Sequence, residues 1–535
     1  MTLFPSLQRE GVEVRSTIAM NHLHFIDYFI ILIVLGITLW LGFRFAKKQN
    51  TTENYFLSKG NFPAWALGLS LLSTLISSNT FLGYPEQGFQ SNWIYLLQGY
   101  MVPIVLLGAI WFIVPLFRKV IGLSTYEYFE KRFGKFARYY SSSSFIIRQF
   151  AGMGSVLTLV ALAIHKLTNI NPVYTLLCVG LVLIILNLKG GMQAVIWLDV
   201  FQGFMLFASG FICLSILLFS IKGGVPEAIK MATENNRTGF GPYDFKLDKL
   251  TFWVLVINGG FYAIQKYATD QTVVQRYLTA KSDRSAIKAS LMGIFLTVPI
   301  WTIFMFIGTA LFVFYKQNSL PADVTPKTVF PYFMMTNLPT GVIGFIVAAL
   351  ISAAICSLSA DINSNAAVGM EDYYKKLRPG RSDKQNLYAS KLMVLLSCFF
   401  AIGMGYFYLN FSSGGIIDLI FTVYAIFSGG IVGIFLLGVF SARANKQGVD
   451  IAIIACILFT AWAFLTSTPI GIRNSKLLLD LGRFNFTHHK LMLGVYSHLV
   501  VIVVGYTASL FFPKPQLAPN LLYSSWKQNR KHENG

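Results

Sequence analysis

Long apolar runs recur along almost the whole chain and constrain its fold more than any other feature. Each run is about twenty residues long, the length at which a helix crosses the ~30 Å hydrocarbon core of a bilayer. The mean hydropathy is +0.58 and only 12% of the 535 residues are charged, whereas about a quarter are charged in typical soluble domains. The sequence therefore predicts an all-α polytopic membrane protein.

The apolar runs predict about thirteen transmembrane helices. No loop between them is long enough for an ATPase, kinase or receptor module, so the helices themselves are expected to carry the function. The predicted spans are 25–45, 63–88, 93–117, 139–165, 172–188, 192–220, 252–275, 287–315, 340–369, 388–409, 414–440, 450–468 and 490–512.

The net charge of +20 is unevenly distributed. Roughly two thirds of the 43 lysines and arginines lie in loops that share one side of the membrane if the N-terminus is outside. The positive-inside rule then predicts an extracytoplasmic segment 1–24 and a cytoplasmic tail 513–535, in the cell (inner) membrane. The basic tail is expected to face lipid or cytosol, not nucleic acid. Residues 1–24 lack the order of a signal peptide, and translation from Met1 or from Met20 both remain open.

The second span carries hydroxyl and amide groups in its middle, from Ser73 to Thr80, followed by Gly83 and Pro85. Polar groups in hydrocarbon are costly, and a helix broken at mid-membrane can use them to line a small wet site. A seam of small residues that packs on another helix is the alternative. The pattern favours a broken helix.

The ninth span places Ala353, Cys356 and Ser357 on one helical face, with Ser359 and Asn363 as a neighbouring polar stripe. Sodium is a hard cation that binds several oxygen ligands. Hydroxyl groups of this face, opposite the carbonyls of a broken helix, would supply them.

Four charged residues inside other predicted spans are candidates for a function or for pairing. Asp199, two turns into the sixth span, either neutralises a cation, or reaches the cytoplasmic interface or caps a neighbouring helix. Lys266 and Asp270 are spaced i, i+4 and either pair with each other or contact a solute. Arg148 either serves a solute or extends to the inner interface.

The chain resembles the sodium:solute symporter family of sodium–glucose, sodium–proline and sodium–sialic acid cotransporters from about residue 25 to 440. The resemblance rests on the second span and on GGMQAVIWLDVFQ (190–202), DQTVVQRYLTAKS (270–282) and AAICSLSADINSNAAVGMEDYY (353–374). It implies a leucine-transporter-type core of two inverted five-helix repeats, broken in the second and seventh spans. The implied division is 25–45 as an extra N-terminal helix, 63–220 and 252–440 as the repeats, and 450–512 as two C-terminal helices.

The resemblance also implies a sodium site made by the carbonyls of Ser73, Ile76 and Ala353 and the side chains of Cys356 and Ser357. Cys356 departs from the family pattern, which has a hydroxyl there, and a thiol is a poor ligand for sodium. Another oxygen replaces it, or sodium binds more weakly, or coupling uses another ion.

Sialic-acid members imply a possible second sodium site at Asp199 and Ser359, although Ala360 stands where they have a serine. Ser77 and Thr80 match positions that contact solute in those members, whereas the galactose-binding residues of the sugar branch are not reproduced. The candidate solute-binding residues are Ser77, Asn79, Thr80, Gln98, Arg148, Lys266 and Tyr267.

These features predict a sodium-coupled symporter, a monomer in lipid, that carries a small polar solute by alternating access. The solute is expected to be a sugar, a sugar acid such as sialic acid, or another organic solute. A sensor built on the transporter fold and a transporter coupled to another ion remain as alternatives. The sequence contains no nucleophile–base arrangement or phosphate loop, and His488-His489 is expected at a membrane interface, so no enzyme is predicted.

Overall fold

The computed structural model describes residues 23–44, 50–58, 62–76, 78–322, 324–410, 429–467, 469–470 and 476–525. Regular structure in these residues is helical except for a hairpin of two-residue strands, β1 (Pro469–Ile470) and β2 (Lys476–Leu477). The helices that position the site are α1 (Phe25–Arg44), α3 (Ala64–Leu75), α4 (Ser78–Gln90), α5 (Leu96–Val120), α6 (Glu127–Phe133), α7 (Lys135–Thr168), α8 (Pro172–Ser220), α10 (Phe252–Ile264), η3 (Gln265–Thr269), α11 (Gln271–Thr279), α12 (Asp283–Gln317), α14 (Val342–Val368), η4 (Gly369–Tyr374), α15 (Lys375–Leu377), α16 (Asp383–Asn410), α18 (Ile431–Phe440), α19 (Lys446–Leu465) and α20 (Lys490–Ser509).

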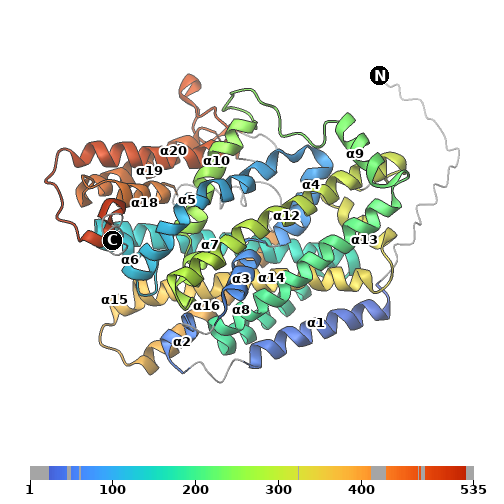
Figure 1. Ribbon diagram of the computed structural model, residues 1–535, viewed down its shortest axis with the longest axis horizontal. Helices are drawn as coiled ribbons and strands as arrows, with labels where there is room; N and C mark the ends of the chain where they lie inside the picture. The colour runs from blue at the N-terminus through green and yellow to red at the C-terminus, as the bar shows by residue number, and fades with distance from the viewer. Residues whose placement is uncertain are drawn as a thin grey trace, which may run out of the picture.

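The long helices lie side by side, with α1 along one edge of the bundle and α19 and α20 at the opposite edge (Figure 1). In the described residues, nine helices are long and apolar enough to cross a membrane, or ten if the bent pair α3 and α4 is one span. The all-α, multi-pass prediction is therefore confirmed, but the predicted number of about thirteen is not reproduced by this criterion.

The difference in number has identifiable causes. The predicted spans 172–188 and 192–220 are joined in α8, whose 49 residues exceed twice the length needed to cross a bilayer. Gly191 interrupts it with φ 54° and ψ −162°, a conformation open to glycine. The span predicted at 252–275 is divided between α10, the π-helical turn η3 and α11, and most of the span at 414–440 lies outside the described residues.

Glycines allow α4 and α12 to approach closely beside the break in the second span. A Cβ atom on Gly88 would lie 2.3 Å from the carbonyl oxygen of Met305, and one on Gly308 would lie 2.2 Å from that of Pro85. No larger residue fits either position, as is typical of small-residue crossings in membranes. The packing fixes α4 against a long, continuous helix.

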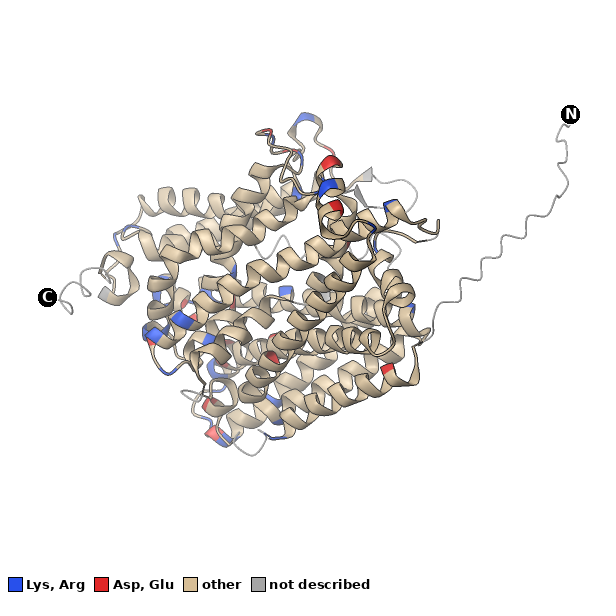
Figure 2. Cartoon of the chain, turned by 45° about the vertical axis from the view of Figure 1, so that its right-hand side comes forward, with Lys and Arg blue, Asp and Glu red and all other residues tan. Residues whose placement is uncertain are grey.

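Burial distinguishes the central helices from the peripheral ones. In the apolar window of the span that α14 forms, 89% of residues are buried, against 22% for α1. The long helices are almost free of charge along their length, and the Lys, Arg, Asp and Glu residues gather mainly at their ends and in the loops (Figure 2). The few charges inside the bundle therefore require partners or a function.

Candidate functional site

The second predicted span is broken, as its sequence indicates. Helix α3 ends at Leu75, and Ile76 is extended, with φ −112° and ψ 116°. The helical segments on either side of the break differ in direction by 55°. Helix ends leave backbone carbonyls without helical partners, so the break supplies acceptor oxygens at this depth in the bundle.

The sodium-site residues predicted on α14 lie opposite this break. The Ser357 hydroxyl donates a hydrogen bond of 3.2 Å to the carbonyl oxygen of Ile76. Both residues are buried, and Ala353 lies one turn before Ser357 on the same helix. The structure thus brings together the two segments that the sequence analysis assigned to a cation.

The Cys356 side chain points to a different helix. Its thiol donates to Asp199 of α8, whose carboxylate also accepts hydrogen bonds from Ser70 and from Arg276, the latter at 2.7 Å. Arg276 donates a further bond of 2.7 Å to the Ser70 hydroxyl. Asp199 is fully buried in this network.

The proposed second pair, Asp199 and Ser359, have separate partners. The Ser359 hydroxyl accepts a hydrogen bond of 3.1 Å from Asn187. Ser73, from the first sodium set, donates a hydrogen bond of 2.7 Å to the backbone carbonyl of Asp199. Asp199 therefore adjoins the first sodium set through Ser73 and Cys356, while Ser359 lies against the first half of α8.

Paired charges surround the second helix break, between η3 and α11. The Asp270 carboxylate is buried and accepts bonds from Arg148 at 2.7 Å and from Lys266 at 2.9 Å. The pairing predicted for Lys266 and Asp270 is confirmed, and Arg148 joins the same carboxylate instead of reaching the inner interface. The side chains of Arg148 and Lys266 stay 22% and 16% exposed. Two cations thus share one carboxylate and still face accessible space.

The remaining solute-site candidates are not joined to one another by hydrogen bonds in the described residues. Thr80 is buried, and Gln98 of α5 donates a 3.0 Å hydrogen bond to Asn258 of α10. Tyr267 is fully buried, and its hydroxyl has no partner among the described residues. Ser77 and the side chain of Asn79 lie outside the described residues.

The sequence analysis missed two polar residues beside the charge cluster. Gln149 of α7 donates 2.6 Å and 3.2 Å hydrogen bonds to Asp361 of α14 and to Thr272 of α11. Asp361 follows Ser357 by four residues and so shares its face, a spacing visible in the sequence.

A further ion-pair network ties the end of α14 to α6 and α7. Arg138 contacts both Glu130 and Asp372, and Lys376 donates a 3.0 Å bond to Glu130. Burial of Glu130 acts to raise its pKa, but the hydrogen bonds from Arg138 and Lys376 outweigh it and hold the pKa below the ordinary value. This network holds α6, α7 and the segment after α14 together and does not include the charged residues at the two helix breaks.

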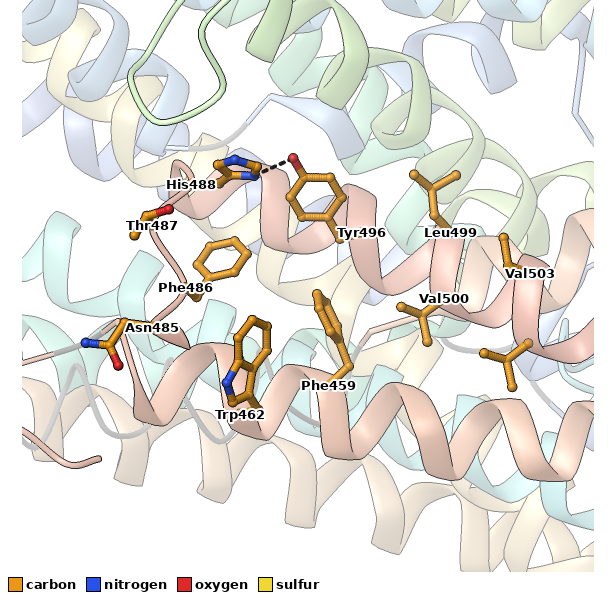
Figure 3. Close-up of a pocket in the computed structure, with 11 residues that line it drawn as sticks. Phe459, Trp462, Asn485, Phe486, Thr487, His488, Tyr496, Leu499, Val500 and Val503 are labelled. Atoms are coloured by element: carbon orange, nitrogen blue, oxygen red, sulfur yellow. Dashed lines mark hydrogen bonds between the residues drawn. The ribbon is translucent and has the colours of Figure 1, made fainter. Parts of the chain in front are cut away.

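A groove of about 570 Å³ runs between α19 and α20, away from these residues (Figure 3). Aromatic rings and valines line it, and His488 forms a 2.6 Å hydrogen bond with Tyr496 at one end. In the part of the chain that the structure describes, no three His, Cys, Asp or Glu side chains are placed to hold a metal ion. None of the predicted site residues lines this groove.

Two broken spans, with a hydroxyl group of an enclosed helix facing one break and paired charges at the other, define a secondary transporter of the membrane. The sequence profile of the sodium:solute symporter family matches residues 55–457. The chain belongs to this family.

Individual relatives agree with this assignment. The sodium/sialic acid symporter NanT of Aliivibrio fischeri is 29% identical over 91% of this chain and 93% of its own length. The sodium/sialic acid symporter SiaT of Proteus mirabilis is 30% identical over 92% of this chain and 97% of its own length. These relatives are transporters and not enzymes, and the chain is a sodium-coupled symporter of a small solute.

Solved structures show the same fold. The substrate-bound, outward-open structure of a sodium-coupled sialic acid symporter superposes with a TM-score of 0.84 at 29% identity, covering 92% of this chain and all of the other. The transporter Mhp1, of the nucleobase-cation-symport-1 family, gives a TM-score of 0.55 at 15% identity over 88% of this chain and 97% of its own. The second likeness concerns the fold alone.

Proposed function

We propose that this symporter couples one sodium ion, bound between the α3–α4 break and α14, to uptake of a carboxylated sugar derivative of the sialic acid type. The 3.2 Å contact between Ser357 and Ile76 carries the sodium part of the proposal. It brings a hydroxyl and a freed carbonyl together, and the carbonyls of Ser73 and Ala353 complete an oxygen set. The thiol of Cys356 is directed at Asp199 and contributes little to a hard cation.

The solute part rests on the cations at the second break. Arg148 and Lys266 remain partly exposed although both pair with Asp270. A guanidinium and an ammonium bind a carboxylate through charge-assisted hydrogen bonds. The sialic acid symporters that match more than nine tenths of this chain support the same solute class.

We infer that the predicted topology and transport cycle apply to this chain. The bent pair then counts as one span, α8 as two, and α10 with α11 as one. Two inverted repeats at 63–220 and 252–440 would rock about the sodium and solute sites. The protein would act as a monomer in the cell membrane, with the N-terminus outside and the C-terminus in the cytoplasm.

The driving force is sufficient for concentrative uptake. One charge crossing 100 mV contributes about 2.3 kcal/mol, and a tenfold sodium gradient adds about 1.4 kcal/mol. For a neutral solute the two contributions together support an accumulation of several hundredfold per sodium. A monoanion carried with one sodium moves no net charge, so the potential drops out and the sodium gradient alone supports about tenfold accumulation of the proposed solute.

Uptake of radiolabelled N-acetylneuraminate into proteoliposomes tests the proposal. External sodium with a potassium-diffusion potential, negative inside, should give uptake well above that of protein-free vesicles, and external choline should abolish it. Equal uptake in sodium and in choline would overturn sodium coupling. Sugars, amino acids and short carboxylates are tested as alternative solutes. Sodium-dependent uptake of any of these without uptake of N-acetylneuraminate would overturn the solute class.

A further inference from the structure

Asp361 differs in its burial from the residues around it on α14. Every residue of α14 from Ile346 to Val368 is buried except Asp361, which is partly exposed. Its neighbours along α14 are buried and Gln149 of α7 contacts its carboxylate, so its exposed part lies between helices of the bundle. A carboxylate in such a place is costly unless something binds it.

Three other carboxylates buried in the bundle have basic partners. Asp199 pairs with Arg276, Asp270 with Arg148 and Lys266, and Asp372 with Arg138. In the described part of the chain, Asp361 forms no ion pair, and its carboxylate accepts a single hydrogen bond, from the Gln149 amide at 2.6 Å. It retains acceptor capacity for a further donor.

Asp361 shares its surroundings with the charges at the second break. The Asp270 carboxylate accepts a hydrogen bond of 2.9 Å from the backbone N–H of Thr272. Gln149, the residue after Arg148, links Asp361 to Thr272 at the start of α11. The accessible space is therefore bordered by two cations that donate hydrogen bonds and by one carboxylate that accepts them.

We propose that Asp361 accepts hydrogen bonds from the solute and makes the transporter select an anion that carries hydroxyl or N–H groups over a bare carboxylate or a halide. The inference rests on the proposed solute class and names a residue that sets it. An anion without hydrogen-bond donors would leave the Asp361 carboxylate without a further partner and would be repelled by its negative charge. An anion with hydroxyl or N–H groups would donate hydrogen bonds to this carboxylate. Sites built to hydrogen-bond a ligand group reject analogues that lack the group.

The test compares two probes, N-acetylneuraminate and propionate, in wild type and Asp361→Asn. The amide keeps the size of the side chain and removes its charge. We expect the half-saturating concentration of N-acetylneuraminate to rise by about tenfold or more, while that of propionate stays constant or falls. Asp361→Glu, which retains the acceptor, should preserve part of the discrimination.

Asn365→Ala is the matched control, because Asn365 lies one turn further along α14 and its side-chain amide is buried without a partner among the described residues. It should leave the ratio of the two probes unchanged. An equal shift for both probes in Asp361→Asn, or a shift only in the sodium concentration needed for transport, would overturn the inference. Loss of all sodium-dependent uptake in the wild type would instead refute the proposed function. Sodium-dependent thermal stabilisation of each variant confirms that it is folded.

Discussion

Removal of the Ser357 hydroxyl should weaken sodium coupling without unfolding the protein. The hydroxyl lies 3.2 Å from the Ile76 carbonyl oxygen and is one of the few oxygens aimed at the break. An interaction with a charged partner is worth about 1.5–3 kcal/mol. Ser357→Ala is therefore expected to raise the half-saturating sodium concentration about 10- to 100-fold, since each 1.4 kcal/mol is a factor of ten.

The assay is initial-rate solute uptake over a range of sodium concentrations at fixed solute. Ser352→Ala is the control, because Ser352 lies on the same helix, is buried, and has a hydroxyl without a partner among the described residues. Its sodium dependence should match the wild type. If Ser357→Ala shifts the sodium dependence less than threefold, or no more than the control does, the placement of the cation between α14 and the break is wrong.

Three further variants test neighbouring contacts. Cys356→Ser replaces a soft sulfur by an oxygen and should lower the half-saturating sodium concentration several-fold in uptake assays; an unchanged value would remove Cys356 from the cation site. Arg276→Met leaves the buried Asp199 carboxylate unpaired and should destabilise the protein by about 3–5 kcal/mol. Adding Asp199→Asn to the same chain should recover part of this lost stability, as measured by thermal unfolding. No recovery would contradict the pairing of Arg276 with Asp199. The pKa of Glu130 is depressed in the folded protein. Its stabilising effect is therefore full above its unfolded-state pKa, about 4.3, and is lost as the pH falls through its lower folded-state pKa. Glu130→Gln should flatten the acid limb of the curve of stability against pH, and an unchanged acid limb would exclude Glu130 as its cause.

The sequence predicted the membrane class, the broken second span and the apposition of two distant segments for one reason. Hydrocarbon allows few polar groups, so hydroxyls in the middle of an apolar run and on one face of α14 carry strong information. The contact between Ser357 and Ile76 joins exactly the two segments that this rule singles out.

The partners of the buried charges were harder to predict. Arg276 stands in a loop-like stretch by hydropathy, yet it is buried against Asp199 because the break after η3 turns α11 into the bundle. Arg148 of α7 pairs with Asp270, which lies 122 residues further along the sequence. Local patterns do not contain such pairings, because they depend on how the helices pack.

Hydrogen–deuterium exchange in sodium and in choline tests the central claim most directly. The sodium ion is expected to slow amide exchange in peptides that cover residues 73–80 and 353–357, with little change in α19 and α20. Ser357→Ala should abolish this protection at sodium concentrations that saturate the wild type. Protection that is absent from both segments, or that appears elsewhere and survives the substitution, would contradict the account.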